Sequence, residues 1–264
     1  PPANLVFLID VSGSMEALDW SPRTPTGVKF RTRLDVVKEA FADFIARRPD
    51  DLIGLVTFGG YAVTRAPLTT DHEALRHVLE GVEIPKQSFD REGRLLNQEE
   101  LLTAIGDALT TALARLKTSE PRSRIVVLLS DGESNTGLIS PDQAVQAART
   151  LGIRIYTIGV GTTGVAPFRG RDAFGREQIF RQEVTLDEAL LRRVADATNA
   201  RYFNVRDAQG LEDAMGEIDT LEKTRVERDV YHHYNERFPW LLWPALVLIL
   251  LATGLNMVLT RRII

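Results

Sequence analysis

The chain has no cysteine among its 264 residues, and it has only four histidines. Disulfide bonds and thiolate metal sites are therefore excluded, and a zinc or haem site is not expected from so few histidines. Basic residues are in the minority, because 32 Lys and Arg stand against 36 Asp and Glu, which gives a net charge of −4. Nucleic-acid-binding proteins usually carry a basic face, so nucleic acid is not expected as a partner.

Signatures of common enzymes are also missing. No P-loop is present, and Gly159-Val160-Gly161 lacks the remaining spacing of a dinucleotide motif. No histidine lies in a serine-hydrolase context. Phosphohydrolases of the haloacid dehalogenase type need a second Asp two residues after the first, but Ser12 occupies that position after Asp10. We therefore predict that the chain is not an enzyme, with a phosphohydrolase of this type as an alternative.

One stretch near the amino terminus combines an apolar run with an acid and two hydroxyl groups. The residues from Leu5 to Ile9 are all apolar, which is typical of a strand buried on both faces of a parallel sheet. Asp10 then falls at the carboxyl end of that strand, where open α/β sheets place their ligands. Gly13 allows a sharp turn, so the hydroxyls of Ser12 and Ser14 can point toward the same place as the carboxylate.

Carboxylate and hydroxyl oxygens gathered in this way suit Mg²⁺, which prefers octahedral oxygen coordination and keeps some of its water. The alternative is that Asp10, Ser12 and Ser14 only cap turns and the following helix. We favour a metal site.

The segment Asp10-Val11-Ser12-Gly13-Ser14 resembles the first part of the metal-ion-dependent adhesion site (MIDAS) of von Willebrand factor A (VWA) domains. In that family a threonine from a second loop and an aspartate from a third complete the site. Thr103, which opens Thr103-Ala104-Ile105-Gly106-Asp107, and Asp131, which follows the apolar run from Ile125 to Leu129, match those two positions. The resemblance implies that Asp10, Ser12, Ser14, Thr103 and Asp131 hold Mg²⁺, or Mn²⁺ or Ca²⁺ in its place.

More narrowly, the chain resembles membrane-anchored VWA proteins of the bacterial aerotolerance (Bat) type. Pro67-Leu68-Thr69-Thr70-Asp71, Tyr156-Thr157-Ile158-Gly159 and Asn235-Glu236-Arg237-Phe238 carry this narrower match. The resemblance implies a module that binds a partner protein through an Asp or Glu, which fills an open position on the ion. It further implies related VWA membrane proteins and a MoxR-type AAA+ ATPase as partners, and a role in chaperone or assembly work or stress tolerance. Helix contacts through Gly254 or Asn256 offer a route to an oligomer. A membrane scaffold with a vestigial metal site is the alternative.

The pattern along the chain predicts an α/β fold of the Rossmann-like, doubly wound type. Its sheet is expected to be mostly parallel, with helices on both faces. The spacing of apolar residues predicts strands at 52–58, 125–130, 153–158 and 202–205, and helices at 33–48, 71–79, 104–117, 141–151 and 211–221. Thr185 and Glu188 form a capping-box pattern at the start of another helix, and residues 159–182, with five glycines, are interpreted as a loop.

The carboxyl-terminal tail is predicted to anchor the chain in a membrane. Trp240 to Thr260 contains no charge, and as a helix it would span roughly 31 Å. The predicted organisation is a VWA domain at 1–224, a juxtamembrane linker at 225–238 and a transmembrane helix at 239–262. The pair Arg261-Arg262 favours a cytoplasmic carboxyl terminus, with the domain on the opposite side of the membrane. The resemblance to Bat-type proteins implies that this is the periplasmic side of a bacterial inner membrane. Because the chain begins at Pro1 without an initiator methionine, we expect a trimmed amino terminus.

Overall fold

The computed structural model describes residues 3–21, 23–24, 27–28, 30–88, 90, 92, 94–119, 123–171, 176–232 and 238–260. The chain divides into two compact units, Pro1–Glu222 and Lys223–Ile264, and the helix α6 (Ala208–His232) crosses the boundary between them. The predicted limits of domain, linker and membrane segment stay predictions. The second unit contains one further helix, α7 (Phe238–Thr260).

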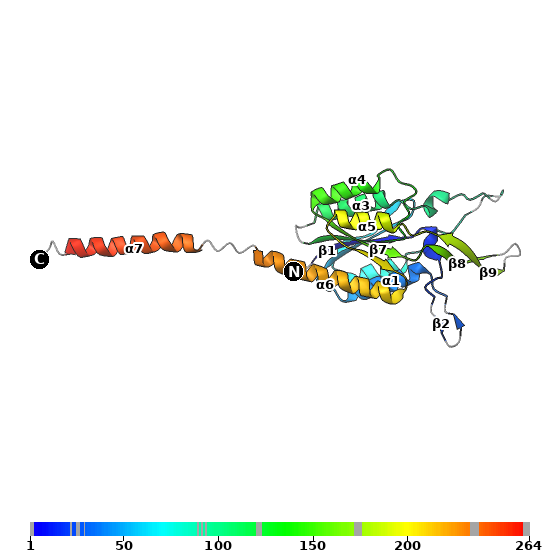
Figure 1. Ribbon diagram of the computed structural model, residues 1–264, viewed down its shortest axis with the longest axis horizontal. Coiled ribbons are helices and arrows are strands. Elements are labelled where there is room, and N and C mark those ends of the chain that lie inside the picture. Colours follow the sequence, from blue (N-terminus) through cyan, green and yellow to red (C-terminus); the bar gives the residue numbers. More distant parts are fainter. Residues whose placement is uncertain are drawn as a thin grey trace. The chain divides into compact units, whose positions relative to one another are not determined.

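A six-stranded sheet forms the centre of the first unit (Figure 1), with the strand order β10-β7-β6-β1-β4-β5. All neighbours pair in parallel except β4 and β5, which are antiparallel. The predicted mostly parallel α/β sheet is therefore confirmed. Its strands are β1 (Asn4–Asp10), β4 (Leu52–Phe58), β5 (Ala62–Thr69), β6 (Arg124–Ser130), β7 (Arg154–Val160) and β10 (Tyr202–Val205).

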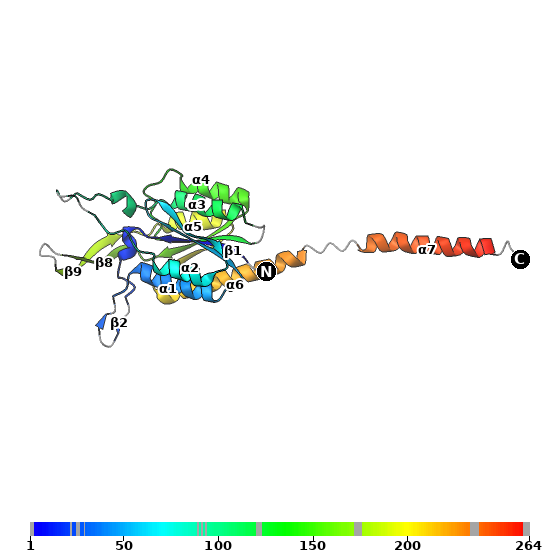
Figure 2. The same cartoon turned by 180° about the vertical axis from the view of Figure 1, so that it is seen from behind.

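Helices cover both faces of this sheet, as predicted. The helices α3, α4 and α5 lie on one face, and α1, α2 and α6 lie on the other (Figures 1 and 2). Their bounds are α1 (Arg33–Ala46), α2 (His72–Glu80), α3 (Ile105–Lys117), α4 (Pro141–Leu151) and α5 (Glu188–Ala197). The predicted signals at α4 hold, because Ser140 caps its start and Gly152 ends it in the left-handed conformation with φ 65°.

The central strand β1 explains why the two apolar layers are separate. Alternate side chains of a strand point to opposite faces, so Leu5, Phe7 and Ile9 join the core under α1 and α6. Val6 and Leu8 join the core under α3, α4 and α5. Because both faces of β1 are buried, its interior must be apolar throughout, which agrees with the run from Leu5 to Ile9.

The interpretation of residues 159–182 as a loop is wrong. After β7 ends, β8 (Gly164–Arg171) and β9 (Glu177–Val184) form an antiparallel hairpin. The hairpin is attached to the first predicted metal loop, because Ala17 packs against Ala166, Phe168 and Val184. The Leu18 amide also donates to the Pro167 carbonyl at 2.8 Å. Gly164 and Gly170 in β8 hide this pattern in the sequence.

The predicted capping box at Thr185 is wrong as well. The side chain of Asp187 accepts a hydrogen bond from the Leu190 amide at 2.9 Å, so Asp187 is the N-cap of α5. Leu190 is the third residue of the helix, so the cap lies at Asp187 and the helix begins later than a cap at Thr185 would set. The remaining short elements are η1 (Gly13–Glu16), β2 (Arg23–Thr24), β3 (Gly27–Val28) and η2 (Gln98–Leu101).

The predicted transmembrane helix at 239–262 is not confirmed. Within the described residues, no helix has both the length and the apolar character needed to cross a membrane. Arg261 and Arg262, which set the predicted orientation, lie outside the described residues.

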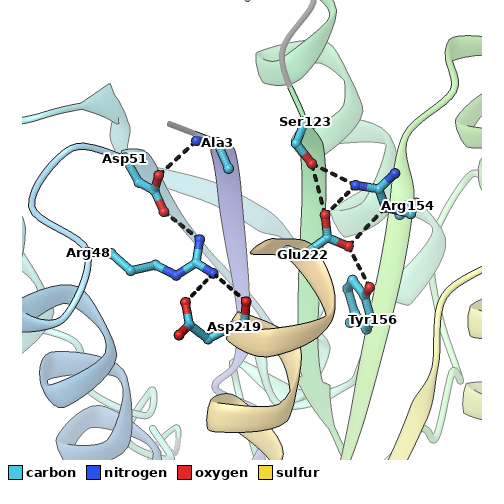
Figure 3. A network of polar contacts seen from close by, with 8 residues as sticks. All are labelled: Ala3, Arg48, Asp51, Ser123, Arg154, Tyr156, Asp219 and Glu222. Carbon is cyan, nitrogen blue, oxygen red and sulfur yellow. Dashed lines mark hydrogen bonds and ion pairs between the residues drawn. The ribbon is translucent and has the colours of Figure 1, made fainter. Parts of the chain in front are cut away.

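At the amino ends of the strands, α6 is fixed to the sheet by Glu222, whose side chain is 2% exposed. Its carboxylate accepts hydrogen bonds from Ser123 Oγ at 2.9 Å, Arg154 Nε at 3.0 Å and the Tyr156 hydroxyl at 2.5 Å. Arg154 forms a second bond to the same carboxylate through its terminal nitrogen (Figure 3). A buried carboxylate is therefore neutralised and hydrogen-bonded on both oxygens.

A second cluster lies one helical turn earlier on α6 (Figure 3). Arg48 pairs with Asp219 of α6 at 2.5 Å and with Asp51 at 2.5 Å. Asp51 also accepts the backbone amide of Ala3, at 2.7 Å, directly before β1. The two clusters together hold α6 in one register against the sheet.

Replacing Glu222 by Ala is expected to destabilise the fold, because Arg154 then loses its partner at a mostly buried position. The expected loss in the free energy of unfolding is about 3 kcal/mol. Glu217→Ala is the matched control on the same helix, because the ion pair of Glu217 with Arg201 is exposed and should contribute about 1 kcal/mol or less. Urea unfolding of both variants measures the difference, and equal losses would contradict this account of Glu222.

Candidate metal centre

Three loops meet at the carboxyl edge of the sheet. Asp10 is the last residue of β1, Asp131 follows β6, and Thr103 lies two residues before α3. Because β1 pairs in parallel with β6, with Ile9 opposite Leu129, the two aspartates leave the sheet side by side. The fold thus brings the predicted first and third segments to one place.

Asp10 is held rigidly by its hydrogen bonds. One carboxylate oxygen accepts the Ser12 amide at 2.8 Å, and the other accepts the hydroxyl of Ser130 at 2.6 Å. Ser130 in turn accepts the Gly132 amide at 3.0 Å. Asp10 and Ser130 are both 0% exposed. Ser130 was not predicted as a site residue, and the only sequence signal is its position at the end of an apolar run.

The predicted hydroxyl groups lie next to one another. Ser12 Oγ and Ser14 Oγ are 3.1 Å apart, and the Ser14 hydroxyl hydrogen-bonds Asp131. Buried Met15 anchors the turn, and its amide donates to the Ser12 carbonyl at 3.1 Å. The first loop therefore connects directly to the third.

Thr103 is buried, and its backbone is joined to the third loop by Asn135. The Thr103 amide donates to Asn135 Oδ1 at 2.8 Å, and the Asn135 amide donates back to the Thr103 carbonyl at 3.1 Å. The Thr136 amide reaches the same carbonyl at 3.4 Å. Asn135 is absent from the predicted site, because nothing in its local sequence indicates a partner 32 residues away.

Asp107 fixes the far part of the third loop. Its two carboxylate oxygens accept the amides of Leu138 at 3.0 Å and Ile139 at 2.8 Å. Gly106 permits this close approach, since a Cβ there would lie 1.8 Å from the Ile139 carbonyl oxygen. Asp107 belongs to the predicted threonine segment, but its sequence context predicts no role for it.

The two central carboxylates oppose each other electrostatically. Burial, followed by the negative charge of Asp131, raises the pKa of Asp10 to about 7, although hydrogen bonds from Ser12 and Ser130 act the other way. Burial also raises the pKa of Asp131, against the hydrogen bond from Ser14 and the positive charge of Arg33. Two buried like charges are unfavourable, and a divalent cation between them would relieve the repulsion.

Arg33 supplies a fixed positive charge that acts on Asp131, and it was not predicted. Its side chain is 1% exposed, and its Nε donates to Asp19 Oδ1 at 2.9 Å. A Cβ at Gly161, where φ is +108°, would lie 2.4 Å from Arg33 Cζ, so only glycine fits there. The guanidinium therefore joins the first loop to the end of β7.

The donor set fits a hard cation. It consists of the carboxylates of Asp10 and Asp131 and the hydroxyls of Ser12, Ser14 and Thr103, which are all oxygen ligands. Across the part of the chain that the structure describes, no three His, Cys, Asp or Glu side chains gather into a metal-binding group. Metal coordination by the five predicted residues stays a prediction.

Comparison with protein families agrees with this architecture. The model of the von Willebrand factor type A domain matches residues 4–217. The chain belongs to this family. The match covers the sheet, both helical layers and all three loops of the candidate centre, so this VWA domain includes every predicted metal ligand.

Individual relatives support the narrower resemblance to aerotolerance proteins. This VWA chain is 25% identical to an aerotolerance-related membrane protein from Bacteroides fragilis, with a TM-score of 0.62, over 84% of this chain and 99% of that one. BatB from Bacteroides thetaiotaomicron is similar at 25% identity and a TM-score of 0.61, with the same shares covered. A UPF0353 protein from Nocardia farcinica is 30% identical over 93% of this chain and 69% of its own length. The chain spans only 60% and 57% of two other curated relatives.

The buried Asp10 is expected to make the metal-free VWA domain less stable as pH rises. Its pKa of about 7 in the folded state lies above the ordinary 3.8, so the folded state holds a proton that the unfolded state has released. The free energy of unfolding should therefore fall between about pH 4 and pH 7. Asp10→Asn should remove this contribution and unfold at a higher temperature than the wild type at pH 8.

Thermal unfolding in metal-free buffer at several pH values measures this effect. Asp142→Asn is the matched control, because Asp142 is exposed on α4. The wild type and this control should give parallel curves, and only Asp10→Asn should differ. A pH dependence of Asp10→Asn that equals the wild type's would refute the expected role of Asp10.

Proposed function

We propose that this VWA domain is a metal-dependent protein-binding module and not an enzyme. The observation that carries the proposal is the pair of buried, mutually repelling carboxylates, Asp10 and Asp131, beside the adjacent hydroxyls of Ser12 and Ser14. A divalent cation, Mg²⁺ or alternatively Mn²⁺ or Ca²⁺, compensates both charges. Ser130 keeps Asp10 oriented, and Asn135 keeps the Thr103 segment beside the third loop.

The bound cation supplies an electrophilic position that the carboxylate of a partner protein can occupy. Both carboxylate oxygens of Asp10 accept hydrogen bonds, one from the Ser12 amide and the other from the Ser130 hydroxyl. These bonds fix the carboxylate in place and share its negative charge with the two donors. Capture of an Asp or Glu from the partner would then depend on the ion. The pairing is selective, because loss of the partner's carboxylate leaves the cation uncompensated.

The resemblance to aerotolerance proteins supports the wider part of the proposal. A relative from Bacteroides fragilis is named as an aerotolerance-related membrane protein. We therefore place this domain at a bacterial membrane, on its periplasmic face. There it would act with related VWA proteins and with a MoxR-type AAA+ ATPase in assembly or stress tolerance. An oligomer of this chain is one form that the complex would take.

Calorimetric titration of Mg²⁺, Mn²⁺ and Ca²⁺ into the full chain tests the metal site. The wild type should bind at least one of these ions, and Asp10→Ala should bind it at least about tenfold more weakly, because one of the two carboxylates is lost. Asp142→Asn is the control and should bind like the wild type. Each titration is repeated with acetate, so that a carboxylate is available to the ion.

Selection from a displayed library of random dodecapeptides then tests partner binding. Peptides retained by the Mg²⁺-loaded chain and released by EDTA should be enriched in Asp or Glu. Absence of ion binding with and without acetate would refute the metal site. If the retained peptides are not released by EDTA, metal-dependent binding is wrong.

A further inference from the structure

An apolar side chain stands fully in solvent at the border of the metal centre. Leu138 is 97% exposed, although the backbone around it is fixed by two hydrogen bonds to Asp107. Its loop adjoins the threonine segment, because a Cβ at Gly137 would lie 3.3 Å from the Ala104 Cβ. The exposed leucine is thus held in place near Thr103 and not on a freely moving loop.

A second exposed group lies in another loop that contacts the same segment. The Ala104 amide donates to the Gly59 carbonyl at 2.8 Å, which places the end of β4 beside Thr103. Tyr61 follows two residues later, and it is 58% exposed. Its hydroxyl donates to Glu99 at 2.5 Å, which orients the ring. Leu138 and Tyr61 therefore belong to two loops that both contact Ala104, the residue after Thr103.

Three glutamates adjoin the segments of the centre. Glu133 is exposed two residues after Asp131, and its amide donates to that carboxylate at 3.4 Å. Glu16 is exposed at the end of η1, two residues after Ser14, and Glu99 is exposed beside Tyr61. Arg33 does not offset these charges at the surface, because it is buried and bound to Asp19.

These charges restrict which partner fits. A divalent cation balances the two buried aspartates, so the surface around it keeps the negative charge of Glu16, Glu99 and Glu133. A partner with several acidic residues would be repelled by this border, whereas Lys or Arg beside a single acid would be attracted. Apolar neighbours of that acid would cover Leu138 and Tyr61 and remove their surface from water.

We propose that the partner presents one Asp or Glu flanked by apolar residues and by Lys or Arg. This inference rests on the proposed function, since the single acid is the one that reaches the ion. Leu138 and Tyr61 form the apolar contact, and Glu133 and Glu16 form the charged contact. The ion then selects for an acid, and this border selects among acidic partners.

The test reads the sequences of the dodecapeptides that EDTA releases from the Mg²⁺-loaded full chain. With the wild type, peptides with one acid next to apolar and basic residues should be enriched. Leu138→Ser should bind Mg²⁺ as the wild type does, yet bind the selected peptides about tenfold more weakly in fluorescence anisotropy. Glu133→Gln should weaken the preference for Lys and Arg, because Glu16 remains, whereas Glu73→Gln, an exposed change on α2, should leave it unchanged.

The outcomes separate this inference from the proposed function. If EDTA releases acidic peptides that lack apolar and basic neighbours, and Leu138→Ser binds them as well as the wild type does, the border has no selective role. The metal-dependent module would still stand. If EDTA releases no acidic peptides from the wild type, the proposed function and this inference both fall.

Discussion

The parallel pairing of β1 between β4 and β6 is the constraint on which the rest of the structure depends. Its register sets Asp10 opposite Phe58 and one step beyond the Ile9 and Leu129 pair. Parallel strands end at the same edge of a sheet, so the loops after β1, β4 and β6 must meet there. A one-residue slip would turn the apolar side chains of β1 to the wrong helical layers and would displace Asp10.

Buried carboxylates are paired with arginines at the amino edge of the sheet, whereas at the carboxyl edge they face each other. At the amino edge, Glu222 is neutralised by Arg154, and Asp219 is paired with Arg48, so α6 is held firmly. At the carboxyl edge, Asp10 faces the like charge of Asp131 and gains only hydrogen bonds from neutral groups. The first arrangement is expected of a structural anchor. The second favours a bound cation, and it costs stability until the cation is present.

Prediction from sequence succeeded where the signal was local and strong. The apolar runs of the strands and the cap at Ser140 needed no knowledge of the fold. It failed at the hairpin of β8 and β9, whose pairing joins residues up to 20 positions apart, as Gly164 and Val184 show. It failed at Thr185 because two residues near one helix start could each cap it, and Asp187 has the carboxylate that reaches the Leu190 amide.

The sequence by itself determined the mostly parallel α/β fold, and it indicated the segments of Asp10, Thr103 and Asp131 as candidates for one centre. Only the tertiary structure decided which groups support them. Ser130 bonds Asp10 across 120 residues, and Asn135 bonds Thr103 across 32. The physical reason is that strand periodicity and caps depend on neighbours in sequence. Hydrogen bonds between loops depend on distances that exist only after the sheet has brought its strand ends together.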